Sequence, residues 1–184
     1  LATLMPAATL LKMKVTDIQP AEYAPYQEAY IKLVNDEWNL TEELEVSLHN
    51  FIHFVREIPM DKYDYRYAEG KWVIKDIIQH VIDSERIFAY RALRIARGDK
   101  TPLPGFEEND YAVSANAEKR HLQDLLTELS IVRQGNIFMF KSFTDEELAR
   151  TGAASGYTVS ARALGFLLIG HQNHHMNIFK ERYL

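Results

Sequence analysis

Apolar residues recur every three or four positions in four long stretches of the chain. Polar residues occupy the positions between them, which predicts amphipathic helices with one buried face. Asn39 and Glu42 stand three residues apart at the start of the first stretch, as a capping box requires, and Gly98 follows the second as a stop. The four stretches cover residues 39–58, 73–97, 115–141 and 161–184.

The segments between these stretches are polar, and we expect them to be loops without paired strands. Two prolines and a glycine in residues 99–111 exclude regular structure, and the end of that segment is acidic. Thr144 begins a second capping-box pattern, which predicts a short helix, and a glycine-bearing loop covers residues 151–157. Thr158 or Ser160 then caps the last helix.

Four long amphipathic helices with polar connections predict an all-α protein, a four-helix bundle. Residues 1–38 break this pattern because Pro20 and Pro25 interrupt any helix and tyrosines are frequent between residues 22 and 34. We interpret them as an irregular N-terminal arm with a short helical turn, packed over the bundle. The predicted organisation is therefore an arm at 1–38 and a bundle domain at 39–184.

Composition narrows the functional classes. The chain has 184 residues, 47% of them hydrophobic, and a net charge of −5 with scattered lysines and arginines, which argues against nucleic acid as a partner. It has no cysteine, which excludes disulfides, a cysteine nucleophile and thiolate ligands. Residues 1–11 lack the pattern of a secretory signal, and no run approaches the ~18 apolar residues of a membrane span. We expect a cytoplasmic enzyme or binding protein that acts on a small molecule.

Three histidines lie on the predicted apolar faces. His171 and His175 are four residues apart within the apolar stripe of the last helix, so both imidazoles can reach one metal ion. His80 lies on the inward face of the second long helix. Bundle cores build metal sites from facing helices, and three nitrogen ligands leave a coordination position open for water or substrate. The pattern therefore indicates a candidate catalytic metal site.

Two carboxylates flank His80 in the sequence. Asp76 precedes it by one turn and Asp83 follows it by three residues. Either one is placed to accept a hydrogen bond from an imidazole and fix its tautomer. Either one could instead serve as the general base that acts on a metal-bound water or thiol.

A simpler interpretation competes with each of these histidines. A single inward histidine such as His80 is more often a hydrogen-bonded core residue than a ligand. The pair in the last helix favours a metal, because aliphatic neighbours cannot satisfy two buried imidazoles. His174 is rotated off the stripe and is a neighbour, or a substitute ligand if the register differs. His49 and His53 lie beside an apolar stripe and are expected to be solvated or structural.

A basic and aromatic group on the second long helix has two interpretations. Its members could line an anion-binding pocket, or they could form the solvated and ion-paired face that long helices usually carry. The members are Arg86, Tyr90, Arg91 and Arg94.

Two sequence motifs resemble those of a known family. Residues 67–72, which read Tyr-Ala-Glu-Gly-Lys-Trp, lead into residues 77–83 around the histidine of the second long helix, and residues 170–175 read Gly-His-Gln-Asn-His-His. In order, spacing and placement these motifs resemble the DinB-like (DinB/YfiT) superfamily of bacterial four-helix metalloproteins, over roughly residues 39–184. Many relatives carry a glutamine about three residues after the final histidine, where this chain has Ile178.

The resemblance implies a divalent metal, zinc or nickel, bound by His80, His171 and His175. Characterised relatives include S-transferases and isomerases that use mycothiol, bacillithiol or glutathione, and proteins resembling metal-dependent hydrolases. A metal that binds the cofactor thiol would lower its pKa and present a thiolate to an electrophile.

The leading hypothesis is transfer of a low-molecular-weight thiol to a small electrophile through the three-histidine site. Metal-dependent hydrolysis by a bound hydroxide is the alternative among enzymes. A non-catalytic stress or interaction protein would use a metal, with Asp or Glu as fourth ligand, only to stabilise the bundle. An ordinary bundle with core histidines would bind no metal. A homodimer is compatible with all of these, because bundles readily pair through helix faces.

Overall fold

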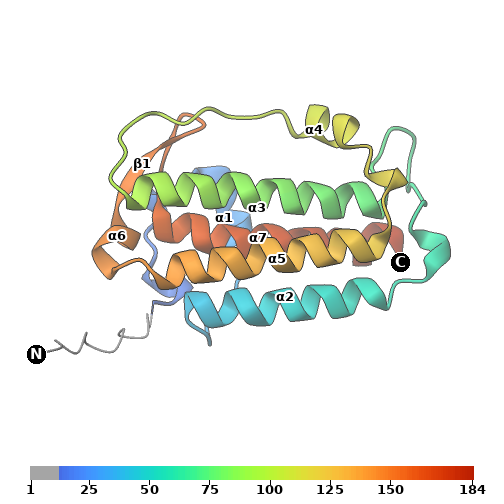
Figure 1. The fold of residues 1–184 in the computed structure, drawn as a ribbon, viewed down its shortest axis with the longest axis horizontal. Helices are drawn as coiled ribbons and strands as arrows, with labels where there is room; N and C mark the ends of the chain where they lie inside the picture. The colour runs from blue at the N-terminus through green and yellow to red at the C-terminus, as the bar shows by residue number, and fades with distance from the viewer. Residues whose placement is uncertain (1–12) are drawn as a thin grey trace, which may run out of the picture.

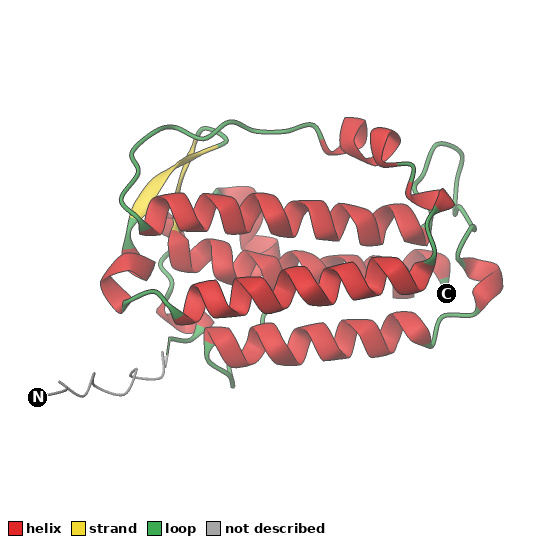
Figure 2. Cartoon of the chain, viewed as in Figure 1, coloured by secondary structure: helices red, strands yellow, loops and turns green. Residues whose placement is uncertain are grey.

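Four long helices form the body of the protein in a computed structural model that describes residues 13–184. They lie side by side along the longest axis of the molecule (Figure 1). The prediction of an all-α four-helix bundle is confirmed, and helix dominates the chain (Figure 2). The four helices are α2 (Leu40–Arg56), α3 (Ile74–Ala96), α5 (Leu122–Lys141) and α7 (Ala161–Ile178).

Shorter elements join and flank the bundle. The regular ones are α1 (Glu28–Ile31), α4 (Glu108–Ala115), α6 (Asp145–Ala149), β1 (Thr151–Ala154) and β2 (Tyr157–Ser160). Single 3-10 turns occur at Val15–Asp17, Pro20–Glu22, Pro25–Gln27, Met60–Lys62 and Ala117–Lys119, and a π-helical turn at Phe179–Tyr183. None of the helices within residues 13–184 combines the length and apolar character needed to cross a membrane.

The long helices are not arranged in simple chain order around the bundle. Both α2 and α3 pack against α5 and against α7. The two helices that follow each other in the sequence, α2 and α3, therefore lie at opposite corners, as Figure 1 shows. This arrangement places α3 directly beside α7, which brings the histidines of these two helices within reach of each other.

Local capping explains where the helices begin. The Asn39 side chain accepts hydrogen bonds from the backbone N–H groups of Thr41 and Glu42, and the Glu42 carboxylate accepts from the Asn39 N–H. Ser160 Oγ accepts from the Ala163 N–H, so Ser160 is the cap of α7. The capping box predicted at Thr144 also forms and opens α6. These three predictions are confirmed.

The expectation of no paired strands is wrong. Strands β1 and β2 form an antiparallel hairpin in which Thr151 pairs with Ser160 and Ala154 with Tyr157. Its two-residue turn, Ser155–Gly156, has positive φ at both residues (53° and 82°), the backbone that closes a tight hairpin. The preceding loop adds to this sheet through Leu103, which donates its N–H to the Ala153 carbonyl. Four-residue strands leave too short a pattern to identify from sequence alone.

The third long helix begins later than expected. The sequence pattern placed its start near residue 115, whereas α5 begins at Leu122. Residues expected to end a loop at 99–111 instead open the separate helix α4. This helix stops at Asn116, whose φ of 50° lies in the left-handed region and turns the chain toward α5.

The N-terminal arm packs over α7. Helix α1 contacts α7 where Gly170 has no side chain, and a Cβ at that position would lie 2.2 Å from the Tyr30 carbonyl oxygen. The Arg162–Glu22 ion pair and a hydrogen bond from Asn173 to the Leu33 carbonyl fix the arm further. Residues 1–12 lie outside the described part, as does the expectation about a signal sequence at 1–11. The boundary at residue 38 stays a prediction.

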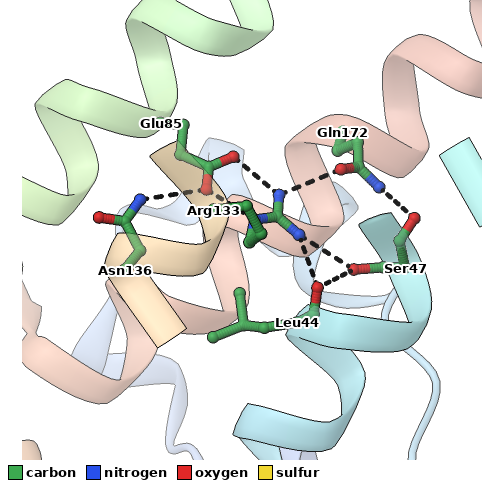
Figure 3. A network of polar contacts seen from close by, with 6 residues as sticks. All are labelled: Leu44, Ser47, Glu85, Arg133, Asn136 and Gln172. Carbon is green, nitrogen blue, oxygen red and sulfur yellow. Dashed lines mark hydrogen bonds and ion pairs between the residues drawn. The ribbon is translucent and has the colours of Figure 1, made fainter. Parts of the chain in front are cut away.

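A buried ion pair ties all four long helices together (Figure 3). Arg133 of α5 is fully buried and donates from Nε and Nη2 to the Glu85 carboxylate of α3, at 2.6 and 2.8 Å. Its remaining donors reach the Leu44 carbonyl and the Ser47 hydroxyl of α2, and the Gln172 amide oxygen of α7, each at 3.1 Å. We call this group the Arg133 network. Because Gln172 of α7 points into this network, the neighbouring His171 points away from it, toward His80 of α3.

Candidate metal centre

Three histidine side chains converge between α3 and α7. The Nε2 atom of His171 lies 3.0 Å from Nε2 of His80 and 3.1 Å from Nε2 of His175, and all three rings are buried. Each residue offers a ligand atom within 4.8 Å of the other two. Nitrogens bound to one zinc ion at about 2.0–2.1 Å in tetrahedral geometry are ~3.3 Å apart. The spacing of this histidine cluster therefore fits one metal ion with little movement.

Burial keeps the three imidazoles neutral. Desolvation, with a smaller effect of His174, lowers the pKa of His80 to about 4. Desolvation and the neighbouring imidazoles lower the pKa values of His171 and His175 well below the ordinary value for histidine. A neutral imidazole keeps the nitrogen lone pair that a metal needs. At neutral pH the cluster therefore has free nitrogen lone pairs, and its all-nitrogen donor set suits a divalent transition metal.

Aromatic rings hold the cluster in place. Tyr30 and Phe88 meet the His171 ring edge-on at 5.6 and 5.9 Å between ring centroids, and Trp72 lies 5.0 Å from His80. Nδ1 of His175 is buried and has no hydrogen-bond partner within residues 13–184. The described part of the protein therefore contacts the His175 ring through Nε2, which faces His171, and leaves Nδ1 without a partner.

Two adjoining cavities open onto the cluster. One, of about 300 Å³, extends toward Trp72 and Tyr183, and we call it the tryptophan lobe. The other, of about 660 Å³, extends toward Arg91 and Ser155, and we call it the arginine lobe. The histidines lie where the lobes meet. The lining shared by both lobes is Tyr30, His80, Glu108, Asn109 and His171.

One carboxylate approaches the cluster from the opposite wall. Glu108 is the first residue of α4, and its Oε2 lies 3.8 Å from His80 Nε2. Its side chain is 58% exposed, so it reaches the cavity from solvent. Sequence reasoning noted the acidic segment but gave it no role. Glu108 is a candidate fourth ligand or proton acceptor, and Tyr30 is a second lining residue that sequence reasoning missed.

The two carboxylates proposed from the sequence lie elsewhere. The Asp76 carboxylate accepts a hydrogen bond from the Val73 N–H and so caps α3. Asp83 accepts from the Gln79 side chain, and its surroundings include Arg86 and Arg120. Within residues 13–184 neither carboxylate hydrogen-bonds an imidazole or lines either lobe, which differs from the expectation. Spacing of three or four residues put them near His80 along α3, but their side chains point to other faces.

The three other histidines considered in the sequence take the positions expected of them. His174 lines the tryptophan lobe, and its ring lies 5.1 Å from Tyr30 and 5.2 Å from His175, so it is a neighbour of the cluster. His49 and His53 are exposed on α2.

Comparisons with known proteins agree with this architecture. The chain is 24% identical over 153 residues to a Bacillus cereus (strain G9842) protein with the provisional name of a metal-dependent hydrolase, covering 82% of this chain and 86% of the relative. The structure of YfiT from Bacillus subtilis, described as a probable metal-dependent hydrolase with an unusual four-helix bundle topology, aligns with a TM-score of 0.65 and 17% identity. That alignment covers 87% of this chain and 91% of YfiT. The family model of the DinB superfamily matches residues 43–179. The chain belongs to the DinB superfamily.

Proposed function

We propose that this protein is a metal-dependent enzyme in which His80, His171 and His175 hold one divalent ion, zinc or nickel. The observation that carries the proposal is the convergence of three neutral, buried imidazole nitrogens at the junction of two cavities. Three protein ligands leave a position for water or substrate, which is typical of catalytic rather than structural zinc. The names of the Bacillus cereus relative and of YfiT agree with this chemistry.

Hydrolysis of a small substrate is the reaction that the residues support best. A bound divalent metal lowers the pKa of a water or thiol and polarises a substrate oxygen. Glu108 Oε2, which lies 3.8 Å from His80 Nε2, would accept the proton that the attacking water releases. Phe88 and Trp72 would exclude bulk water from the reacting atoms because their rings pack against the histidines.

Transfer of a low-molecular-weight thiol to a small electrophile is the second candidate. The two-lobed cavity favours it, because a thiol in one lobe and an electrophile in the other would meet at the histidine cluster. In this reaction Glu108 would accept the thiol proton instead of the water proton.

Product analysis tests both candidates. Protein purified without a metal-loading tag is supplied with zinc or nickel and assayed against esters, amides and epoxides, with and without glutathione or bacillithiol. We expect hydrolysed product without thiol, and a Glu108→Gln variant slower by about 10²-fold or more, as for loss of a general base. His49→Ala, outside the cluster, is the matched control and keeps full activity.

The outcome assigns the reaction. Product that carries the thiol sulfur would favour thiol transfer over hydrolysis. Protein that binds one metal ion and turns over no compound of any class, with or without thiol, would contradict an enzymatic function.

A further inference from the structure

Arg91 is a buried cation without a carboxylate partner. It lies on α3 in the wall of the arginine lobe and is 6% exposed. Its Nη2 donates to the Pro104 carbonyl at 2.7 Å and to Ser155 Oγ at 3.0 Å. These two bonds use two of the five N–H donors of the guanidinium. Within residues 13–184, no atom accepts a hydrogen bond from its Nε or Nη1, and neither nitrogen is sealed from solvent.

The other arginines of this helix are different. Arg86 pairs with Glu128 at 2.7 Å, and Arg94 pairs with Asp99. Of the four residues in the basic and aromatic group, two arginines are therefore ion-paired and Tyr90 accepts a hydrogen bond from Arg94, whereas Arg91 lines the arginine lobe. Arg133 is even more buried than Arg91, but it has the Glu85 carboxylate as its counter-charge.

A charge in this position is costly unless an anion joins it. Burial lowers the pKa of Arg91 from its ordinary value, which shows that its cationic form is poorly solvated. Tyr26 faces it, but burial raises the pKa of Tyr26, so this phenol is neutral at pH 7 and supplies no counter-charge. Both groups that Arg91 does bond, a carbonyl and a hydroxyl, are neutral as well. A neutral donor in place of Arg91 would be enough to join the loop at Pro104 to the hairpin at Ser155.

Ser155 adds a second donor to the same wall. Its φ of 53° is in the left-handed region, which is unfavourable for a residue with a Cβ. The Ser155 N–H bonds to the Leu103 carbonyl, so the turn is fixed against the loop. Because Ser155 Oγ accepts from Arg91, its own O–H proton is available to a third group. The hydroxyl and the guanidinium therefore present donors side by side.

The arginine lobe joins these donors to the histidine cluster. Arg91 follows His80 by eleven residues on one helix, so their backbones are ~16 Å apart along its axis. Ser84 and Phe88 line the lobe between them. A volume of about 660 Å³ is suited to one small organic molecule.

We infer that the arginine lobe binds the anionic end of an elongated substrate, a carboxylate or a phosphate, through Arg91 and Ser155. The reactive end of that substrate lies at the histidine cluster. This second statement rests on the proposed function, whereas the anion site itself does not. Guanidinium groups are well suited to this task because they donate several charge-assisted hydrogen bonds to carboxylate or phosphate.

The first experiment uses metal-free protein, so it is independent of catalysis. The Nε–H signal of Arg91 is followed by NMR while inorganic phosphate, and separately glutarate, is added. We expect a saturable shift with at least one of the two anions, and the stronger binder gives the class of the anionic end. Arg86→Gln, which removes an ion-paired arginine of the same helix, is the control and leaves the shift unchanged.

Variants then assign the binding to these side chains. Arg91→Gln abolishes saturable binding measured by calorimetry, and Ser155→Ala weakens it about threefold or more because one hydrogen bond is lost. If Arg91→Gln unfolds the protein, the Ser155→Ala variant still tests whether the anion binds at this wall. Absence of a saturable Arg91 shift with both anions, or binding that is unchanged in the variants, would overturn the inference.

The second experiment links the anion site to the cluster in zinc-loaded protein. Hydroxamates chelate zinc and are used as probes. Their chains have about four to eight methylenes, which span part of the ~16 Å between His80 and Arg91 along α3. Each chain length is tested in two forms, one that ends in a carboxylate and one that ends in a methyl group. We expect the best carboxylate to bind about tenfold or more tightly than its methyl counterpart, and Arg91→Gln to remove that difference. Equal binding of both forms throughout would contradict the link. Failure to hold zinc would instead contradict the proposed function and leave the result of the anion titrations standing.

Discussion

Two neighbouring residues of α7 belong to opposite kinds of buried polar group. Gln172 joins the Arg133 network, in which all five N–H donors of the guanidinium find acceptors in the protein. His171 belongs to a cluster whose ring nitrogens face one another, with Nδ1 of His175 lacking any partner within residues 13–184. A satisfied network stabilises one arrangement of helices. An unsatisfied cluster beside a cavity indicates a ligand from outside the chain.

The two groups also handle charge differently. Arg133 and Glu85 form a buried ion pair at 2.6 Å, so each supplies the counter-charge of the other. The histidines have no counter-charge, so burial keeps them neutral and their pKa values fall. Arg91 is intermediate, charged and only partly bonded. Stability should therefore depend most on the Arg133 network, and ligand binding on the other two.

The largest expected effect on stability follows from breaking the Arg133 network. Arg133→Met leaves the buried Glu85 carboxylate with the Asn136 amide but without its cationic partner, which should lower the free energy of unfolding by about 3–5 kcal/mol. Urea denaturation of metal-free protein measures it. The control is Lys141→Met, at the other end of α5, which removes an exposed ion pair with Glu45 of α2. It should lower the free energy of unfolding by only ~0–1 kcal/mol. Equal effects of the two variants would contradict the contrast.

Acidification should act on the histidine cluster. The unfolded protein binds a proton at each histidine near pH 6.5, whereas folded His80 does so only near pH 4. Its contribution to stability is therefore fully present above pH 6.5 and is lost as the pH falls toward 4, by about 3 kcal/mol for His80. Urea midpoints of metal-free protein between pH 7 and 4.5 measure this loss. His80→Leu should flatten the pH dependence, and an unchanged slope would be inconsistent with depressed pKa values.

The close approach of the arm to the cluster can be tested at Gly170. Gly170→Ala places a Cβ 2.2 Å from the Tyr30 carbonyl oxygen, so the arm must move, at a cost of about 1–3 kcal/mol. Thermal unfolding and limited proteolysis of the arm measure the change. Gly135→Ala in α5 meets no atom within 4 Å and should instead stabilise the protein, by ~1 kcal/mol. Stabilisation by both substitutions would show that the arm does not depend on Gly170.

The smallest effect is expected at the carboxylate that does not contact the cluster. Asp83→Asn should change zinc affinity by less than the ~10-fold that follows loss of a residue supporting a metal ligand. Competition with a chromophoric chelator measures it. A tenfold or larger loss would restore Asp83 to the role expected from its spacing.

Local patterns were sufficient to predict the long helices. The capping box at Asn39 and the serine cap of α7 depend on residues a few positions apart, and both form as expected. The hairpin was missed because its strands have only four residues each, although Ser155–Gly156 is a local turn signal. The break between α4 and α5 lies at Asn116, whose left-handed backbone the apolar pattern does not reveal.

The candidate site was predictable in part, because the inward direction of a helical side chain follows from the local apolar pattern. Apolar stripes identified which histidines face inward, and the packing of α3 beside α7 brought those of both helices together. Tyr30 and Glu108 come from segments whose approach depends on tertiary packing, and only the acidic and tyrosine-rich compositions hinted at them. Helical spacing predicts nearness along an axis but not side-chain direction, which is why Asp76 caps its helix instead.

Metal stoichiometry tests the central claim most directly. Protein purified without a metal-loading tag is dialysed with zinc or nickel, and bound metal is measured by mass spectrometry beside His80→Ala, His171→Ala and the control His53→Ala. We predict about one equivalent in the unaltered protein and the control, and loss of that equivalent in both cluster variants. Correctly folded protein that takes up no metal, or cluster variants that keep it, would contradict the account.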